Sequence, residues 1–116
     1  MKTLAIQLQP DILAADTCKA AIRILRGLQK DKSLVSSAKF IHGRKQERRY
    51  INVEFSSSDM PKLWKVARKR FFSDDSEVAG LDRGVIVVCQ GNFDWNDYLL
   101  LYHYDPEVQL DKLEPA

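Results

Sequence analysis

The order of two hydrophobic periodicities along the chain is the feature that most constrains its fold. Two segments, from about residue 17 to 30 and from about 61 to 72, repeat apolar residues at steps of three and four, as amphipathic helices do. Five others alternate apolar and polar residues or form short apolar runs, which is typical of strands; they are residues 3–9, 34–42, 48–56, 85–90 and 98–104. The order β-α-β-β-α-β, with one more strand, predicts an α+β sandwich of the ferredoxin-like type. We therefore expect an antiparallel sheet with both helices on one face and an additional C-terminal strand.

Capping residues are expected at the start of each helix. Asp16 or Thr17 can accept a hydrogen bond from the first free N–H groups of the first helix. Ser58 or Asp59 can do so for the second helix. Pro61 fits the first turn of that helix because an N–H at this point would have no helical partner.

Length and composition predict a single folded domain. The chain has 116 residues, of which 45% are hydrophobic and 29% charged, and such a chain can bury a core of its own. Residues 1–106 are predicted to form the domain and residues 107–116 a C-terminal tail. No apolar run approaches the roughly 18 residues of a membrane helix, and the N-terminus lacks the apolar stretch of a signal peptide. We expect a cytoplasmic protein that does not bind membranes.

Neither the cysteines nor the acidic residues follow a metal-binding pattern. Cys18 and Cys89 are far apart and outside any Cys-x-x-Cys pair, which predicts two reduced core thiols. Residues 92–97 hold two aspartates and two asparagines, but lack the glycine and glutamate spacing of a calcium loop. We expect no metal site here, and a hairpin turn in which these side chains bond their own backbone.

No catalytic motif is present in the sequence. His42 and His103 are the only histidines, and no nucleophile elbow, zinc-binding helix, phosphate-binding loop or dinucleotide fingerprint occurs. His103 alternates with tyrosines in a strand pattern, where a structural role is commoner than a general-base role. The chain is expected to be non-enzymatic, with no catalytic residues and no cofactor.

The last strand pattern, residues 98–104, is apolar and aromatic on both faces. A strand with water on one side would carry polar residues there, so this strand is expected to be covered on both sides. The cover could be a protein partner, a second copy of the chain or, for a central strand, the tail. We favour an interaction module that forms a homodimer or binds a partner through the open sheet face, because tyrosine and tryptophan are enriched at interfaces. The expected contacts are Phe93, Trp95, Tyr98, Leu100, Tyr102 and Tyr104. Phe93 and Trp95 have an alternative, which is to fold back onto the core.

The alternative function is nucleic-acid binding, and it depends on an uneven charge distribution. Residues 1–72 carry 16 Lys+Arg against 6 Asp+Glu, whereas residues 73–116 carry 2 against 10. Such a split favours either an acidic partner for the first part or mutual attraction of the two parts. The basic residues form a stripe on the first helix, a cluster beside the expected hairpin turn at Gly43, and a second cationic helix, which together could follow a phosphate backbone. The candidate contacts are Lys19, Arg23, Arg26, Lys30, Arg44, Lys45, Arg48, Arg49 and Tyr50.

The segment 48–55 resembles in part the RNP1 octamer of RNA-recognition motifs. Basic Arg48 and aromatic Tyr50 stand where that octamer has them, as do two of its apolar residues. Arg49 and Asn52 replace its glycine and its second stacking aromatic, and the first strand, with Leu4 and Ile6, lacks the aromatic of the companion motif. The resemblance therefore implies one stacking residue at most, Tyr50.

Overall fold

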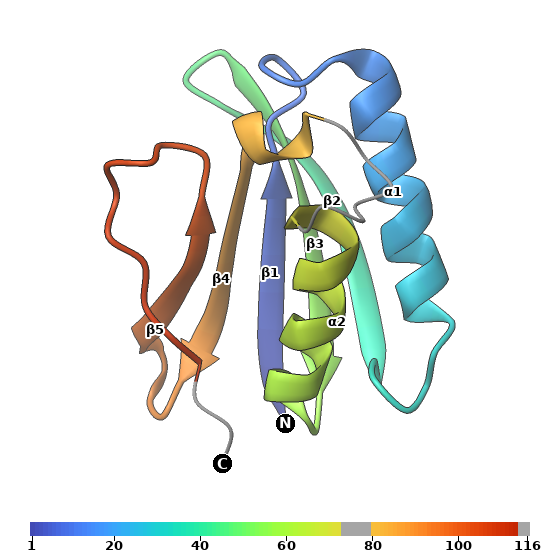
Figure 1. Cartoon of the computed structure of the whole chain (residues 1–116), viewed down its shortest axis with the longest axis vertical. Helices are drawn as coiled ribbons and strands as arrows, with labels where there is room; N and C mark the ends of the chain where they lie inside the picture. Colours follow the sequence, from blue (N-terminus) through green and yellow to red (C-terminus); the bar gives the residue numbers. More distant parts are fainter. Residues whose placement is uncertain (73–79, 114–116) are drawn as a thin grey trace.

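The computed structural model describes residues 1–72 and 80–113, which form five strands and two α-helices. The elements are β1 (Lys2–Leu8), α1 (Ala15–Gln29), β2 (Ser37–Lys45), β3 (Arg48–Ser57), α2 (Met60–Phe72), the 3₁₀ turn η1 (Leu81–Arg83), β4 (Val85–Gly91) and β5 (Asp94–His103). Both helices lie over the same face of the sheet (Figure 1). The expected α+β class with two helices and an antiparallel sheet is confirmed.

The sheet has the order β2-β3-β1-β4-β5, and every neighbouring pair is antiparallel. β1 lies in the middle, paired with β3 on one side and β4 on the other. α1 connects β1 to β2, with β3 between them in the sheet, and α2 connects β3 to β4, with β1 between them. Each helix is therefore a crossover connection over an inner strand. The edge strands are β2 and β5.

The core lies between the helices and the inward side chains of the three inner strands. The register places Leu4 of β1 between Phe55 of β3 and Cys89 of β4, and all three are fully buried. Alternation in the sequence predicts Ile51, Val53 and Phe55 as the inward set of β3, and this is confirmed, since Val53 and Ile51 are also buried. The radius of gyration, 13.4 Å, is the value expected for one compact domain of this length.

The two helices begin differently. Asp59 caps α2, as expected, because its carboxylate accepts the Lys62 N–H at 3.3 Å, and Pro61 lies in the first turn. The expected cap of α1 by Asp16 or Thr17 is wrong, because that helix begins earlier, after Ala14, with no side-chain cap. Asp16 instead lies in the first turn, where a negative charge complements the helix dipole.

The β2–β3 turn is not at Gly43. β2 continues to Lys45, and a two-residue turn follows, with φ of 52° at Gln46 and 68° at Glu47. These values match a type I′ turn, whose twist fits paired strands. Gly43 lies opposite Tyr50, and a Cβ at this glycine would overlap the tyrosine ring. The glycine is therefore needed for the ring of Tyr50 and not for the turn.

The β4–β5 hairpin is tighter and more irregular than expected. β5 begins at Asp94 rather than 98, yet Cys89 of β4 pairs with Leu99, so most of residues 95–98 bulge from the ladder. The Asp97 carboxylate accepts the N–H groups of Asn92 at 3.0 Å and Phe93 at 2.7 Å. The expected turn in which side chains bond the local backbone is confirmed at Asp97.

The chain after β5 returns alongside that strand (Figure 1). The N–H of Asp111 donates to the carbonyl of Leu100, and the Leu100 N–H donates to the Asp111 carboxylate, both at 2.8 Å. Leu113 packs against the core. The alternative of a central last strand is thus wrong, because β5 is an edge strand that this segment partly covers. The polar, acidic segment 73–84 is predicted by its sequence to be a helix end and a loop, and its residues 73–79 lie outside the described residues.

Candidate functional site

The sheet face that the helices do not cover is polar over the strands β1 and β3 and apolar toward the strands β4 and β5. Over β1 and β3 it carries hydrogen-bonded polar side chains, such as the Gln7 amide donating to Asn52 at 3.0 Å. Over β4 and β5 it carries apolar residues, because the register aligns Ala5, Val88 and Leu100 across three strands. Together with Ile86 these residues form what we call the apolar strip, and all four are half-buried.

The tip of the β4–β5 hairpin, residues 92–98, exposes aromatic side chains beside this strip. Phe93 is 73% exposed, Trp95 41% and Tyr98 54%. By strand alternation Tyr98 lies on the same face as Leu100. Since the Asp97 carboxylate binds two backbone N–H groups of the tip, the aromatics are presented by an ordered turn, which lowers the entropy lost on binding.

Two of the residues expected at a partner interface lie elsewhere. Tyr102 lies on the helix face, where its ring stacks on Phe72 with centroids 4.0 Å apart and planes 12° from parallel. A register shift between Val87 and Val88 explains this, because it places buried Leu101 and Tyr102 in succession on the helix side. Tyr104 is half-buried, with its ring centroid 4.6 Å from that of His103.

The hydroxyl of Tyr102 is uncharged in this setting. It donates to the backbone carbonyl of Asp82 at 3.1 Å. Burial raises its pKa, and the nearby Asp82 carboxylate raises it further.

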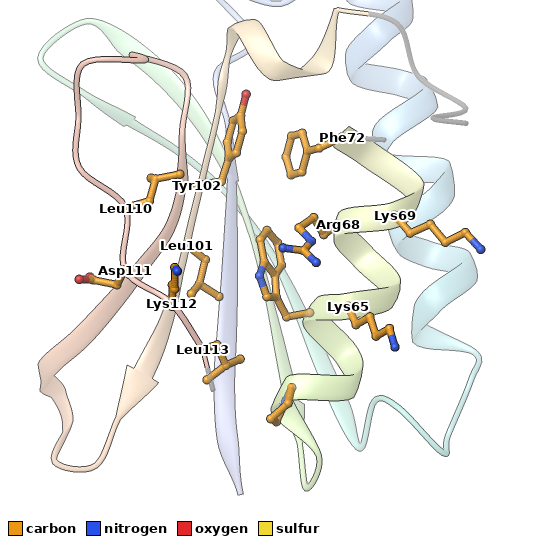
Figure 2. Close-up of a pocket in the computed structure, with 12 residues that line it drawn as sticks. Lys65, Arg68, Lys69, Phe72, Leu101, Tyr102, Leu110, Asp111, Lys112 and Leu113 are labelled. Carbon is orange, nitrogen blue, oxygen red and sulfur yellow. The ribbon is translucent and has the colours of Figure 1, made fainter. Parts of the chain in front are cut away.

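A groove that the sequence did not predict lies between α2 and residues 110–113. Its volume is about 1030 Å³, and Leu101 and Tyr102 form its floor. Figure 2 shows Arg68 of α2 directed into this α2 groove, whereas Lys65 and Lys69 extend away along the outer side of the helix. The spacing of Trp64, Arg68 and Phe72 at every fourth residue was a signal for a shared helix stripe, but nothing in the sequence placed residues 110–113 opposite it.

The basic residues of α1 are exposed, as the stripe predicted. The guanidinium of Arg26 lies 4.6 Å above the ring of Phe40 in β2, a cation–π contact that attaches the helix to the edge strand. Lys19, Arg23 and Lys30 form no ion pair among the described residues. They remain available to a ligand.

The basic residues of the β2–β3 hairpin differ in their contacts, because Arg49 is ion-paired and the others are exposed. Arg49 binds Asp11 through its side chain, with Nη2 2.8 Å from Oδ1, and through its backbone N–H, 2.8 Å from Oδ2. The backbone hydrogen bond from Arg49, followed by the one from its side chain, lowers the pKa of Asp11. Arg44, Lys45 and Arg48 are exposed. Among the described residues, the ion pair of this hairpin therefore lies within the basic part of the chain, residues 1–72, and not between that part and residues 73–116.

Tyr50 occupies the open face of β3, where the partial RNP1 resemblance would need a stacking residue. One side of its ring lies against Gly43 of β2, and the residue is half-buried. Asn52, which replaces the second aromatic, bonds Gln7 in the polar end of this face. A base could reach only the free side of one ring.

Residues with catalytic or metal-binding chemistry are dispersed. His42 is on β2 and His103 on β5, at opposite edges of the sheet. Within residues 1–72 and 80–113, no three His, Cys, Asp or Glu side chains gather as a metal ion would require. Cys18 and Cys89 are free and buried, as expected, and burial raises the pKa of the Cys89 thiol to about 11.

None of the helices in the described residues is long and apolar enough to cross a bilayer. Comparison with known proteins finds no family model, no curated protein and no solved structure that matches the chain.

Proposed function

We propose that this chain is a protein-interaction module that binds through the β4–β5 end of its sheet. The observation that carries this proposal is the exposure of Phe93, Trp95 and Tyr98 on one ordered hairpin tip beside the apolar strip. Aromatic residues next to an apolar centre are typical of interface anchors. The tip loses little conformational freedom on binding because Asp97 already orders it.

We further propose that the fold is ferredoxin-like. The order β4-β1-β3-β2 within the sheet and the two crossovers through α1 and α2 support this assignment, with β5 added beside β4. In such an arrangement the helices cover one face of the sheet and leave the other for a partner.

The occupant we propose for the apolar strip is a second copy of the chain. A strip of aliphatic residues without charges can pack against itself around a two-fold axis, as in an isologous dimer. The flanking Tyr98 and His103 would then lie at the polar rim. A different protein partner is the alternative occupant.

Sedimentation velocity at micromolar concentrations tests the dimer. Leu100→Lys would place an unpaired charge in the interface and is expected to give a monomer. Ile41→Lys is the matched control, since Ile41 is an apolar residue on the same sheet face, 38% exposed, but on β2 at the opposite edge. It should leave the dimer intact.

A monomeric wild-type chain would overturn the dimer, and equal effects of the two variants would overturn the location. Circular dichroism of both variants checks that they fold. In the monomer case, Phe93→Ala and Trp95→Ala would test for a different partner in a binding assay.

Nucleic-acid binding is a second candidate function, supported by the exposed basic residues of α1 and of the β2–β3 hairpin. Binding that uses Lys19, Arg23 and Lys30 must weaken steeply with salt, because phosphate contacts release condensed counterions. Labelled oligonucleotides titrated at about 50 and 200 mM salt test this, and a contact set of this kind should change affinity severalfold or more across that range. Arg44→Ser with Lys45→Ser should weaken binding to all sequences alike, and no binding at low salt would rule the function out.

A further inference from the structure

The α2 groove has an aromatic and aliphatic lining on the helix side of the molecule, away from the proposed dimer surface. Trp64 and Leu101 are buried in it, while Phe72, Tyr102 and Leu113 are half-buried. Its lining on α2 extends from Pro61 to Phe72, which is about 16 Å of helix. The groove is thus long, and its base is apolar.

Positive charge faces this apolar base from both walls. Arg68 points into the groove from α2, and Lys112 lies on the opposite wall (Figure 2). The one acidic residue of the lining, Asp111, is turned away toward β5, where its carboxylate accepts the Leu100 N–H at 2.8 Å. The Tyr102 hydroxyl is occupied by the Asp82 carbonyl. Among the described residues that line the groove, a ligand therefore meets cations from both walls and no free carboxylate.

We propose that the α2 groove binds an amphipathic carboxylic acid. Its apolar chain would lie along Trp64, Phe72 and Leu113, and its carboxylate between Arg68 and Lys112. A guanidinium is suited to this role because its planar fork can hold a carboxylate with two parallel hydrogen bonds. The volume of about 1030 Å³ is at the upper end of small-ligand sites, about 300–1,000 Å³.

A small acid fits the groove better than an extended peptide. A peptide that added a strand to β5 would need free N–H and C=O groups along its outer edge. At Leu100 both groups are already bonded to Asp111. Affinity must then come from the apolar base and the two cations.

Fluorescence of Trp64 offers a direct test. In the Trp95→Phe variant Trp64 is the remaining tryptophan, and it lines the groove. Titration with decanoate is expected to give a saturable change in its emission. Decanol, the neutral analogue, should bind about tenfold more weakly or worse, because a charge-assisted hydrogen bond is lost.

Two variants on the same helix locate the carboxylate. Arg68→Gln removes the cation that points into the groove and should weaken decanoate binding about tenfold. Lys62→Gln removes an exposed cation of the same helix that does not line the groove and should leave the affinity unchanged. Equal affinities of decanoate and decanol, equal effects of the two variants, or no saturable change would each overturn the proposal. Binding only of an acidic, leucine-rich peptide would also overturn it and assign the groove to a protein partner.

This inference is independent of the dimer. Leu100→Lys changes the opposite face of the sheet, so decanoate should bind that variant as it binds the wild type. Thermal unfolding of Arg68→Gln verifies that a loss of binding is not a loss of folding.

Discussion

The two hairpins at the edges of the sheet differ in charge, in turn geometry and in what covers their outer strand. The β2–β3 hairpin, residues 37–57, carries five Lys+Arg, has a regular register and ends in a two-residue turn. The β4–β5 hairpin, residues 85–103, carries no Lys or Arg, has shifts in its register and exposes aromatics at its tip.

This difference shows two ways of treating a sheet edge. Charged side chains on β2 disfavour pairing with another chain, as lysine and arginine do on many edge strands. β5 has no lysine or arginine, and its edge is covered instead by the segment around Asp111, which bonds the backbone of Leu100. The first edge resists association, whereas the surface beside the second is where we propose that association occurs.

The largest effect is expected from a matched pair of glycine substitutions, one in each hairpin. A Cβ at Gly91 would overlap the backbone carbonyl of Asp97, which cannot move without breaking the turn. Gly91→Ala should therefore lower the free energy of unfolding by about 3 kcal/mol. Gly43→Ala should cost only about 1 kcal/mol, because the overlapping Tyr50 ring can rotate away. Urea denaturation of both variants checks the order, and a larger loss for Gly43→Ala would contradict this comparison.

Loss of the Asp97 acceptors should have the next largest effect. Each carboxylate oxygen of Asp97 accepts a different N–H of the tip, so Asp97→Asn keeps its size but loses one acceptor. We expect a loss of about 1.5 kcal/mol in the free energy of unfolding. Asp94→Asn is the control, since φ at Asp94 is 59° and asparagine tolerates that region. Both variants losing the same stability would argue against a special role of Asp97.

Changing the β2–β3 turn should stabilise the protein. Gln46 and Glu47 both have positive φ, which costs a residue with a Cβ more than it costs asparagine or glycine. Gln46→Asn combined with Glu47→Gly should raise the free energy of unfolding by about 1 kcal/mol. Thermal and urea denaturation measure this gain. Glu47→Ala should bring none, and a gain from alanine would mean that charge rather than φ limits the turn.

The smallest effect concerns the pH dependence contributed by Asp11. Hydrogen bonds from Arg49 lower the pKa of Asp11 in the folded state, so the unfolded chain takes up this proton at higher pH. The stabilisation is then complete above the ordinary carboxyl range and is lost as the pH falls through the lowered pKa. Asp11→Asn should reduce the acid dependence of the melting temperature slightly. The double variant with Arg49→Gln should match Asp11→Asn, whereas Arg49→Gln alone should keep part of the acid dependence because its backbone N–H still bonds Asp11. Additive effects would show that the two side chains act separately.

Much of the architecture follows from local patterns in the chain. Alternation places Val53 and Phe55 inward, the step of three and four defines the helices, and Asp59 followed by Pro61 marks the start of α2. Each of these features depends on residues close together in sequence, because side-chain direction repeats every two residues in a strand and every 3.6 in a helix.

The candidate site was predictable only in part. Phe93 and Trp95 of the tip were predicted either to fold back onto the core or to contact a partner, and the structure leaves them exposed. Tyr102 was expected on the same surface as Leu100. A single register shift at Leu101 moves it to the helix face, against Phe72. The α2 groove depends on residues 110–113 lying opposite α2, which no local pattern encodes.

The sequence by itself determined which segments become strands and helices, which of their faces are apolar, and that both thiols are buried. The tertiary structure alone decided that Gly43 accommodates the ring of Tyr50, that Arg49 is bound by Asp11 and that Asp111 covers the edge at Leu100. The physical reason is the range of the interactions. Periodicity is a property of neighbouring residues, whereas register, ring packing and edge coverage depend on pairs distant in sequence whose energies matter only after the sheet has formed.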